Sequence, residues 1–253
     1  MKNKPFVFTF YISFLLVLGF ISCTPKLYQT TQKQHLQVKI TDSIPEDKEI
    51  LAMIAPYKKQ LDEKMNQEIG ESAMEMHKEG TPQNLLCNFV ADLLLSEINE
   101  NKDYQKVDMA FGSSGGLRNN IPKGKITVRH VYELMPFDNE IVILTLYGSD
   151  IIKLTDFLAT KGTGIFAGGS FIITKDKKSA EVKLNNQTVE AEKTYRVITS
   201  DYIANGGDNL KFLLQAVKRE NTGILFRDMI INYIKKQKQP LSTNIDDRMV
   251  KEK

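Results

Sequence analysis

Tryptophan is absent from this chain of 253 residues, and there are only two cysteines and three histidines. A two-metal hydrolytic centre needs several His, Asp and Asn ligands converging from successive loops. His77 and His130 are the only histidines beyond residue 40, and no Cys-x-x-Cys, His-Glu-x-x-His or Gly-x-x-x-x-Gly-Lys-Ser/Thr motif is present. We therefore expect no metal ligands, no cofactor and no catalytic residue in this chain.

The first 22 residues have the composition of an export signal. Lys2 and Lys4 precede an almost unbroken apolar stretch over 6–20, which ends at Ile21-Ser22-Cys23. That stretch is shorter than the roughly 20 residues of a membrane-spanning helix, the alternative interpretation. The segment Phe-Ile-Ser-Cys resembles the lipobox of bacterial lipoproteins, although Phe20 stands where that pattern prefers leucine. We expect residues 1–22 to be a signal peptide and Cys23 to carry a lipid in a bacterial envelope membrane, facing the periplasm or exterior.

The rest of the chain lacks strong charge and disulfide partners. Without Lys2 and Lys4 the formal net charge falls from +3 to about +1, and no concentrated basic face suggests nucleic-acid binding. With Cys23 lipidated, Cys87 has no partner within the chain, so we expect it to be a buried apolar residue. The folded part is thus expected to need no disulfide and to bind no nucleic acid.

Hydrophobic periodicity predicts helices alternating irregularly with strands. Residues 23–44 form a polar tether, and an amphipathic pattern over 50–65 predicts a helix that Pro56 kinks or restarts. Further helices are predicted at 83–98, 127–134, 149–158 and 224–236, and strands at 106–111, 140–148, 169–176, 179–184 and 194–200. This order favours one α+β domain over 45–238, with a mixed β-sheet and flanking helices. The charged tail, 239–253, is expected to be solvated.

Three polar clusters stand at the ends of predicted strands: "GSSGGLRNNIPKG", "MPFDNE" and "DYIANGGD". Singly, each is compatible with a tight turn, a core aromatic or a turn cap. Together with "NFVADLLL", and in this order, they resemble the C-terminal substrate-binding domain of the 5'-nucleotidase / UDP-sugar hydrolase family. The resemblance extends over about residues 45–235.

The resemblance implies a nucleotide site. Phe137 and Tyr202 match two rings that sandwich the base, and stacking on a π-face tolerates base identity. Asp208 matches the carboxylate that accepts hydrogen bonds from ribose hydroxyls. Asn139 and Ser113 match residues that contact the base or sugar.

The phosphate side and the glycines follow from the same matches. Arg118 matches an arginine that faces the phosphate, where a guanidinium can bond in a bidentate way. Four glycines would let the backbone lie against the ligand, namely Gly115, Gly116, Gly206 and Gly207.

Several positions depart from the family pattern. Tyr202 replaces a phenylalanine, Ser113 an asparagine, and Cys87 a glycine. Where the family often has further arginines for phosphate, this chain offers only His77 and Lys78 as cations. We therefore expect base binding to be more secure than phosphate binding.

We expect no counterpart of the family's metallophosphatase half in this sequence, since the expected signal peptide and tether occupy its place. We expect a nucleotide-binding half that works with a separately encoded metallophosphatase, which would hold the divalent metals, and that is inactive alone. The 50–65 helix would dock this partner or pack on its own domain. One alternative is a non-catalytic lipoprotein that binds nucleosides or nucleotides for uptake or sensing. Another is a degenerate domain whose pocket binds nothing.

Overall fold

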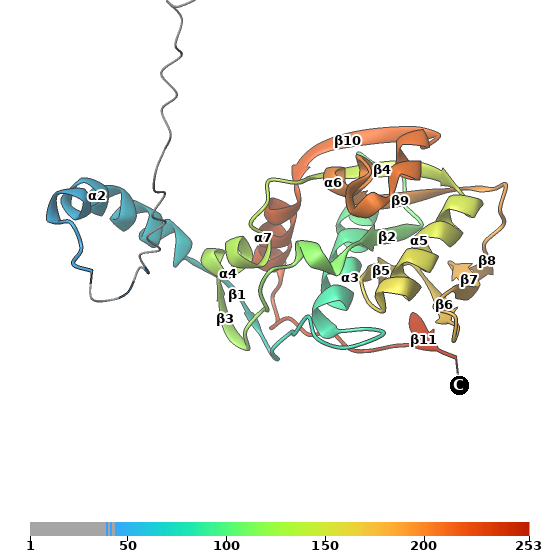
Figure 1. Cartoon of the computed structure of the whole chain (residues 1–253), viewed down its shortest axis with the longest axis horizontal. Helices are drawn as coiled ribbons and strands as arrows, with labels where there is room; N and C mark the ends of the chain where they lie inside the picture. The colour runs from blue at the N-terminus through green and yellow to red at the C-terminus, as the bar shows by residue number, and fades with distance from the viewer. Residues whose placement is uncertain (1–38, 40, 42–43, 253) are drawn as a thin grey trace, which may run out of the picture. The chain divides into compact units, whose positions relative to one another are not determined.

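The computed structural model describes residues 39, 41 and 44–252 (Figure 1). The expected signal peptide, the lipid site at Cys23 and nearly all of the tether lie outside the described residues. The chain divides into two units, residues 1–51 and 52–253, and the second contains every element discussed below except the first turn of α2. Within the described part of the chain, no helix combines the length and the hydropathy that crossing a membrane requires.

The helix α2 (Lys48–Met65) runs without a break through Pro56, so the expected restart does not occur. Asp47 caps its start, because the carboxylate Oδ1 accepts hydrogen bonds from the N–H groups of Glu49 and Ile50 at 2.9 and 3.1 Å. None of the residues of α2 is buried, although the apolar stripe expected from the sequence is present.

A five-stranded mixed sheet forms the centre of the domain (Figure 1). Its strands lie in the order β10 (Lys218–Leu225), β4 (Glu140–Tyr147), β9 (Thr194–Ser200), β2 (Met109–Gly112) and β5 (Ile165–Ala167). The β9–β2 pair is parallel and the other pairs are antiparallel. This arrangement confirms the expected α+β fold with a mixed sheet.

Strand alternation divides the apolar residues between two cores, one on each face of this sheet. In β4, Ile141 and Ile143 belong to one core, and Val142 and Leu144 to the other. The first core is completed by α3 (Leu85–Glu100), α4 (Val128–Leu134) and α7 (Phe226–Lys236). The second is completed by α5 (Gly148–Lys161), α6 (Asp201–Ala204) and a smaller sheet. The strands β4, β9, β2 and β5 are therefore buried on both faces, whereas the edge strand β10 has no buried residue.

The remaining elements are short. The smaller sheet has the order β11 (Met249–Lys251), β6 (Gly169–Ile173), β7 (Ser179–Leu184) and β8 (Gln187–Thr188), and β1 (Glu68–Ser72) pairs with β3 (Gly124–Thr127). Three 3₁₀ turns span Ser114–Gly116, Gly207–Asn209 and Lys211–Gln215.

Two features stand out at helix starts. Thr127, at the start of the helix predicted over 127–134, is the N-cap of α4, and its backbone N–H donates to His130 Nδ1 at 3.1 Å, which gives that histidine a capping role. Cys87 lies buried and free on α3, and burial raises the pKa of its thiol to about 11.

The end of the chain is attached to the fold, so the expectation of a solvated tail over 239–253 is wrong in part, although most of the described residues of this segment are exposed. The last strand, β11, pairs in parallel with β6, and Leu241 is buried. The Arg248 guanidinium is mostly buried, forms ion pairs with Asp92 and Asp246, and donates to the Phe166 carbonyl at 3.0 Å. The sequence could not indicate this ion pair, because Asp92 lies 156 positions before Arg248 in the chain.

Candidate functional site

The topology of the central sheet brings the three polar clusters to one edge. Parallel pairing of β2 with β9 places the carboxyl ends of both strands at the same edge. Antiparallel pairing aligns Ile141, near the start of β4, with Ser200 at the end of β9. The Ser113 loop follows β2, Phe137 precedes β4, and Tyr202 follows β9. Segments about 90 residues apart in sequence therefore meet at one place.

A pocket of about 320 Å³ opens at this edge, within the range of small-ligand sites. Its lining includes eight of the ten residues that the sequence predicted to contact a ligand: Ser113, Gly115, Gly116, Arg118, Phe137, Asn139, Tyr202 and Asp208. Gly206 and Gly207 are not part of the lining, although they directly precede Asp208. The pocket thus brings together side chains from all three clusters.

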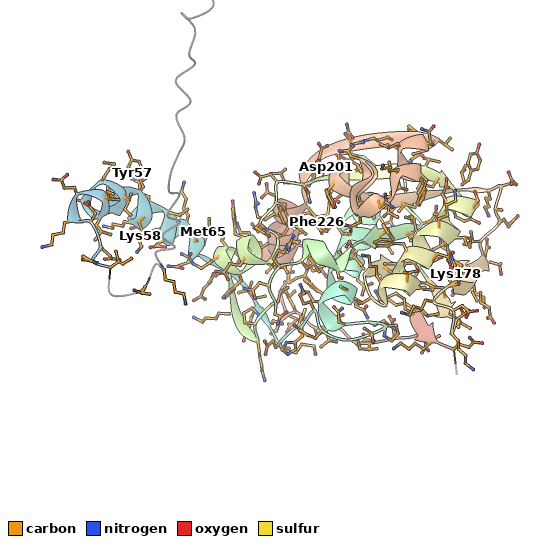
Figure 2. All side chains as sticks on the ribbon, in the orientation of Figure 1. Tyr57, Lys58, Met65, Lys178, Asp201 and Phe226 are labelled. Atoms are coloured by element: carbon orange, nitrogen blue, oxygen red, sulfur yellow. The ribbon has the colours of Figure 1, made fainter. Side chains whose placement is uncertain are left out.

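Sequence reasoning missed the apolar part of the pocket. This part comes from β2, β5, the end of α4, α6 and the start of α7, and comprises Phe111, Met135, Ile165, Ile203 and Phe226. Figure 2 marks Phe226 at the beginning of α7. These residues follow the same periodicity as the core, so no local signal separates them from ordinary buried residues.

Tyr202 and Asp208, which the sequence predicted to contact the base and the sugar of a ligand, are hydrogen-bonded to each other. The Tyr202 hydroxyl donates to Asp208 Oδ1 at 3.2 Å, and the Asp208 backbone N–H donates to the same hydroxyl oxygen at 3.3 Å. Asp208 adopts a left-handed conformation (φ +51°), which an aspartate tolerates better than most residues. Its second carboxylate oxygen, Oδ2, remains available as an acceptor for sugar hydroxyls. The Tyr202 hydroxyl thus orients the Asp208 carboxylate.

The two glycine pairs differ in what their backbone requires. A Cβ at Gly207 would lie 2.5 Å from the Tyr202 carbonyl oxygen and 2.6 Å from its ring, and Gly206 has φ +87°. A Cβ at Gly115 would meet only Ser113 Oγ at 3.4 Å, and one at Gly116 only Met135 Cε at 3.9 Å. The fold itself therefore requires glycine at 206 and 207, whereas at 115 and 116 glycine leaves open space beside the pocket.

On the base side, both predicted stacking residues are partly accessible. Phe137 is 38% exposed and Tyr202 51%, which is unusual for large rings in a folded domain. The Arg118 guanidinium carbon lies over the Phe137 ring, 5.1 Å from its centroid. A base that stacks on Phe137 must use the other ring face or displace Arg118.

The part of the pocket around Arg118, where the sequence predicted phosphate binding, has little positive charge. His77 and Lys78, the other candidate cations, are absent from the lining. Lys78 Nζ donates to the Leu117 carbonyl at 3.1 Å, and the His77 ring contacts Asn120 at 3.2 Å. These side chains support the loop that carries Arg118. Among the described lining residues Arg118 is the only cation and Asp208 the only carboxylate, so the lining carries no net charge.

Two features bear on possible chemistry at the site. Gly112–Gly116 fits the five-letter pattern Gly-x-Ser-x-Gly of a nucleophile elbow. However, Ser114 begins a three-residue 3₁₀ turn and does not line the pocket, and no histidine occurs among the described lining residues. Within the described residues, no group of three or more His, Cys, Asp or Glu could hold a metal ion. The arrangement is suited to binding a ligand through stacking and polar contacts.

The chain is similar to a described domain family and to several known proteins. The family described as "5'-nucleotidase, C-terminal domain" matches residues 63–216. Protein UshA of Escherichia coli is 26% identical over 214 residues, which cover 83% of this chain and 38% of UshA. The trifunctional nucleotide phosphoesterase YfkN of Bacillus subtilis is 27% identical over 239 residues, covering 87% of this chain and 16% of YfkN.

The fold agrees with that of a solved relative. The crystal structure of a 5'-nucleotidase precursor from Thermus thermophilus superposes with a TM-score of 0.70 at 25% identity, and the match covers 82% of this chain and 44% of that one. The chain therefore spans less than half the length of each of these relatives.

Proposed function

Since the chain belongs to the family of 5'-nucleotidase C-terminal domains, we propose that its pocket binds the base and sugar of a nucleotide. In this proposal the chain is the substrate-binding half of a 5'-nucleotidase-type hydrolase in nucleotide catabolism. A separate metallophosphatase in the bacterial envelope supplies the divalent metals and the hydrolytic step.

One observation carries the proposal: Phe137, Tyr202, Asp208 and Arg118 line a single pocket. Two accessible rings supply stacking surfaces for a base, worth roughly 1–3 kcal/mol per base in known sites. A carboxylate held by a neighbouring hydroxyl supplies acceptors for a ribose. The guanidinium of Arg118 can meet a phosphate at the rim of the pocket.

A partner would explain the apolar stripe of α2. Met53, Ile54, Tyr57 and Leu61 recur at helical spacing, and each is exposed, with Tyr57 at 74%. Figure 2 marks Tyr57 and Lys58 on this helix. In our proposal the metallophosphatase covers this stripe, and only the complex of the two chains hydrolyses nucleotides.

A second candidate function is favoured by the charge of the pocket. One arginine and one carboxylate balance each other in the lining, which suits an uncharged nucleoside as well as a nucleotide. In this second hypothesis the chain is a lipoprotein that captures nucleosides for uptake or sensing and needs no catalytic partner.

The test is calorimetric titration of the detergent-solubilised chain with adenosine and then with AMP, beside the Phe137→Ala and Tyr202→Ala variants. We expect wild-type binding that both variants weaken strongly. If wild type binds neither ligand, the stand-alone binding hypothesis fails. Affinity capture then distinguishes the functions: a co-purifying metallophosphatase, with AMP hydrolysis by the complex, supports the split enzyme. Binding without such a partner supports capture of nucleosides.

A further inference from the structure

The loop that carries Phe137 and Asn139 is anchored from behind by Arg227, the second residue of α7. Arg227 Nη1 donates to the carbonyl oxygens of Phe137 and Met135 at 3.3 and 3.5 Å. Its Nη2 donates to Asp138 Oδ1, with which it also forms an ion pair. These contacts fix the backbone around Phe137, because they reach the carbonyl groups of Met135 and Phe137 and the side chain of Asp138.

The guanidinium of Arg227 is buried and lies over an aromatic ring. The residue is 7% exposed, and its guanidinium carbon lies 4.1 Å from the centroid of the Tyr132 ring. Burial lowers the pKa of Arg227, but the hydrogen bond to Asp138 and nearby negative charge outweigh this and raise it overall. Its Nε has no partner among the residues that the structure describes. Burying a cation is costly unless its bonds are well placed, so this arginine is poorly explained as a simple packing residue.

The neighbouring residue of α7 acts on the same loop. The Phe226 backbone N–H donates to the Asn139 carbonyl at 2.8 Å, and the Phe226 side chain lines the pocket. The start of α7 therefore contacts the loop from Met135 to Asn139 at four backbone or side-chain groups. Arg227 itself is not part of the pocket lining, so it cannot act by touching the ligand.

We propose that Arg227 is a positioning residue that fixes the Phe137 ring and Asn139 for ligand binding. The inference rests on the proposed nucleoside site, and it adds a determinant that the sequence did not suggest. A planar guanidinium bonds two carbonyls and a carboxylate while it stacks on Tyr132. A lysine ammonium is a point charge without a planar fork and cannot make this set of contacts.

The first experiment measures adenosine binding to Arg227→Lys and to Arg196→Lys in the full chain. Arg196 is the matched control, because it is also largely buried, pairs with Glu220 and donates to two backbone carbonyls, yet lies outside the pocket lining. We expect Arg227→Lys to weaken adenosine binding about tenfold or more, while Arg196→Lys leaves it within about twofold. Thermal unfolding of both variants shows whether they lose similar stability. Equal binding by wild type and Arg227→Lys would overturn the proposal.

A second readout needs no ligand. Since the chain contains no tryptophan, Phe137→Trp introduces a single indole whose fluorescence anisotropy and acrylamide quenching report the order of the side chain at this position. Adding Arg227→Lys should lower the anisotropy and increase quenching, whereas adding Arg196→Lys should change neither. An unchanged indole signal with Arg227→Lys counts against positioning.

The two readouts separate failure of the inference from failure of the proposed function. If wild type binds neither adenosine nor AMP but Arg227→Lys loosens the indole, the proposed function fails and the positioning of residue 137 stands. If wild type binds adenosine and Arg227→Lys changes neither binding nor indole order, the function stands and the inference is wrong.

Discussion

The parts of the pocket around Asp208 and around Arg118, which we propose to bind the sugar and the phosphate, are built in different ways. On the Asp208 side, Tyr202 and Asp208 exchange two hydrogen bonds, and Gly207 is required by the close approach of the Tyr202 ring. On the Arg118 side, Arg118 is alone among the described lining residues as a cation, and the glycines beside it face open space. One side is organised before a ligand arrives, and the other has room and a single charge.

This difference indicates which part of the proposed ligand the chain can bind without a partner. Groups held in place lose less entropy on binding, so the ordered Tyr202 and Asp208 side chains favour affinity for the base and sugar of our proposal. A single partly screened arginine contributes little to affinity for a dianion. The open side is suited to completion by another protein, which is what the split-enzyme proposal requires.

The largest effect should come from the stacking rings. Phe137→Ala and Tyr202→Ala should each weaken adenosine binding about 5- to 150-fold, because each removes a stacking contact of roughly 1–3 kcal/mol. Calorimetry checks this, and Tyr147→Ala is the control, since Tyr147 is also exposed but lies outside the pocket. Retained affinity in both ring variants would remove the basis for a sandwich.

Removing the charge of Asp208 should affect the sugar selectively. Asp208→Asn should weaken adenosine binding roughly tenfold or more, since a hydrogen bond to a charged group contributes about 1.5–3 kcal/mol. Binding of free adenine, which lacks the sugar, should stay unchanged. Parallel titrations with both ligands measure the difference, and equal losses for both would mean that Asp208 does not read the sugar.

The glycine comparison can be tested directly. Gly207→Ala should lower both the thermal midpoint and adenosine affinity, because its Cβ would lie within 2.6 Å of the Tyr202 ring and backbone. Gly116→Ala should leave the thermal midpoint unchanged, since its Cβ meets only a flexible methionine end at 3.9 Å. Thermal scans of both variants decide the point, and an equally destabilised Gly116→Ala would erase the contrast.

The smallest effect should appear on the phosphate side. AMP should bind no more than about fivefold tighter than adenosine, since an exposed ion pair is worth about 1 kcal/mol or less. Arg118→Ala should abolish that preference, while Lys78→Ala should preserve it because Lys78 faces the loop backbone. A much larger preference for AMP in the isolated chain would show that the phosphate side is more complete than its charges suggest.

Local patterns allowed much of the fold and the candidate site to be predicted. Alternating residues in β4 and β9, the helical stripe of α2 and the cap at Thr127 all depend on neighbours within one or two turns. The resemblance of the three clusters to a known family indicated residues that the structure brings into one pocket. Their roles toward a ligand remain predictions.

The positions that sequence reasoning missed depend on distant partners. The sequence places Arg248 in a charged tail, whereas in the fold it forms an ion pair with Asp92. It offers Lys78 as a cation for phosphate, whereas in the fold the Lys78 ammonium donates to the Leu117 carbonyl. Arg227 carries no local sign that it holds the Phe137 loop.

By itself the sequence determined the longer helices, the central strands β2, β4 and β9 and the residue types of the three loops, because these follow from local periodicity and turn chemistry, but it did not indicate the central strands β5 and β10. Only the tertiary structure decided that the three loops meet at one edge of the central sheet and that apolar residues from several elements complete the pocket. It also decided that Arg227 holds the loop that carries Phe137. The physical reason is that a side chain's partners are set by strand pairing and packing between segments far apart in the chain, which no local pattern records.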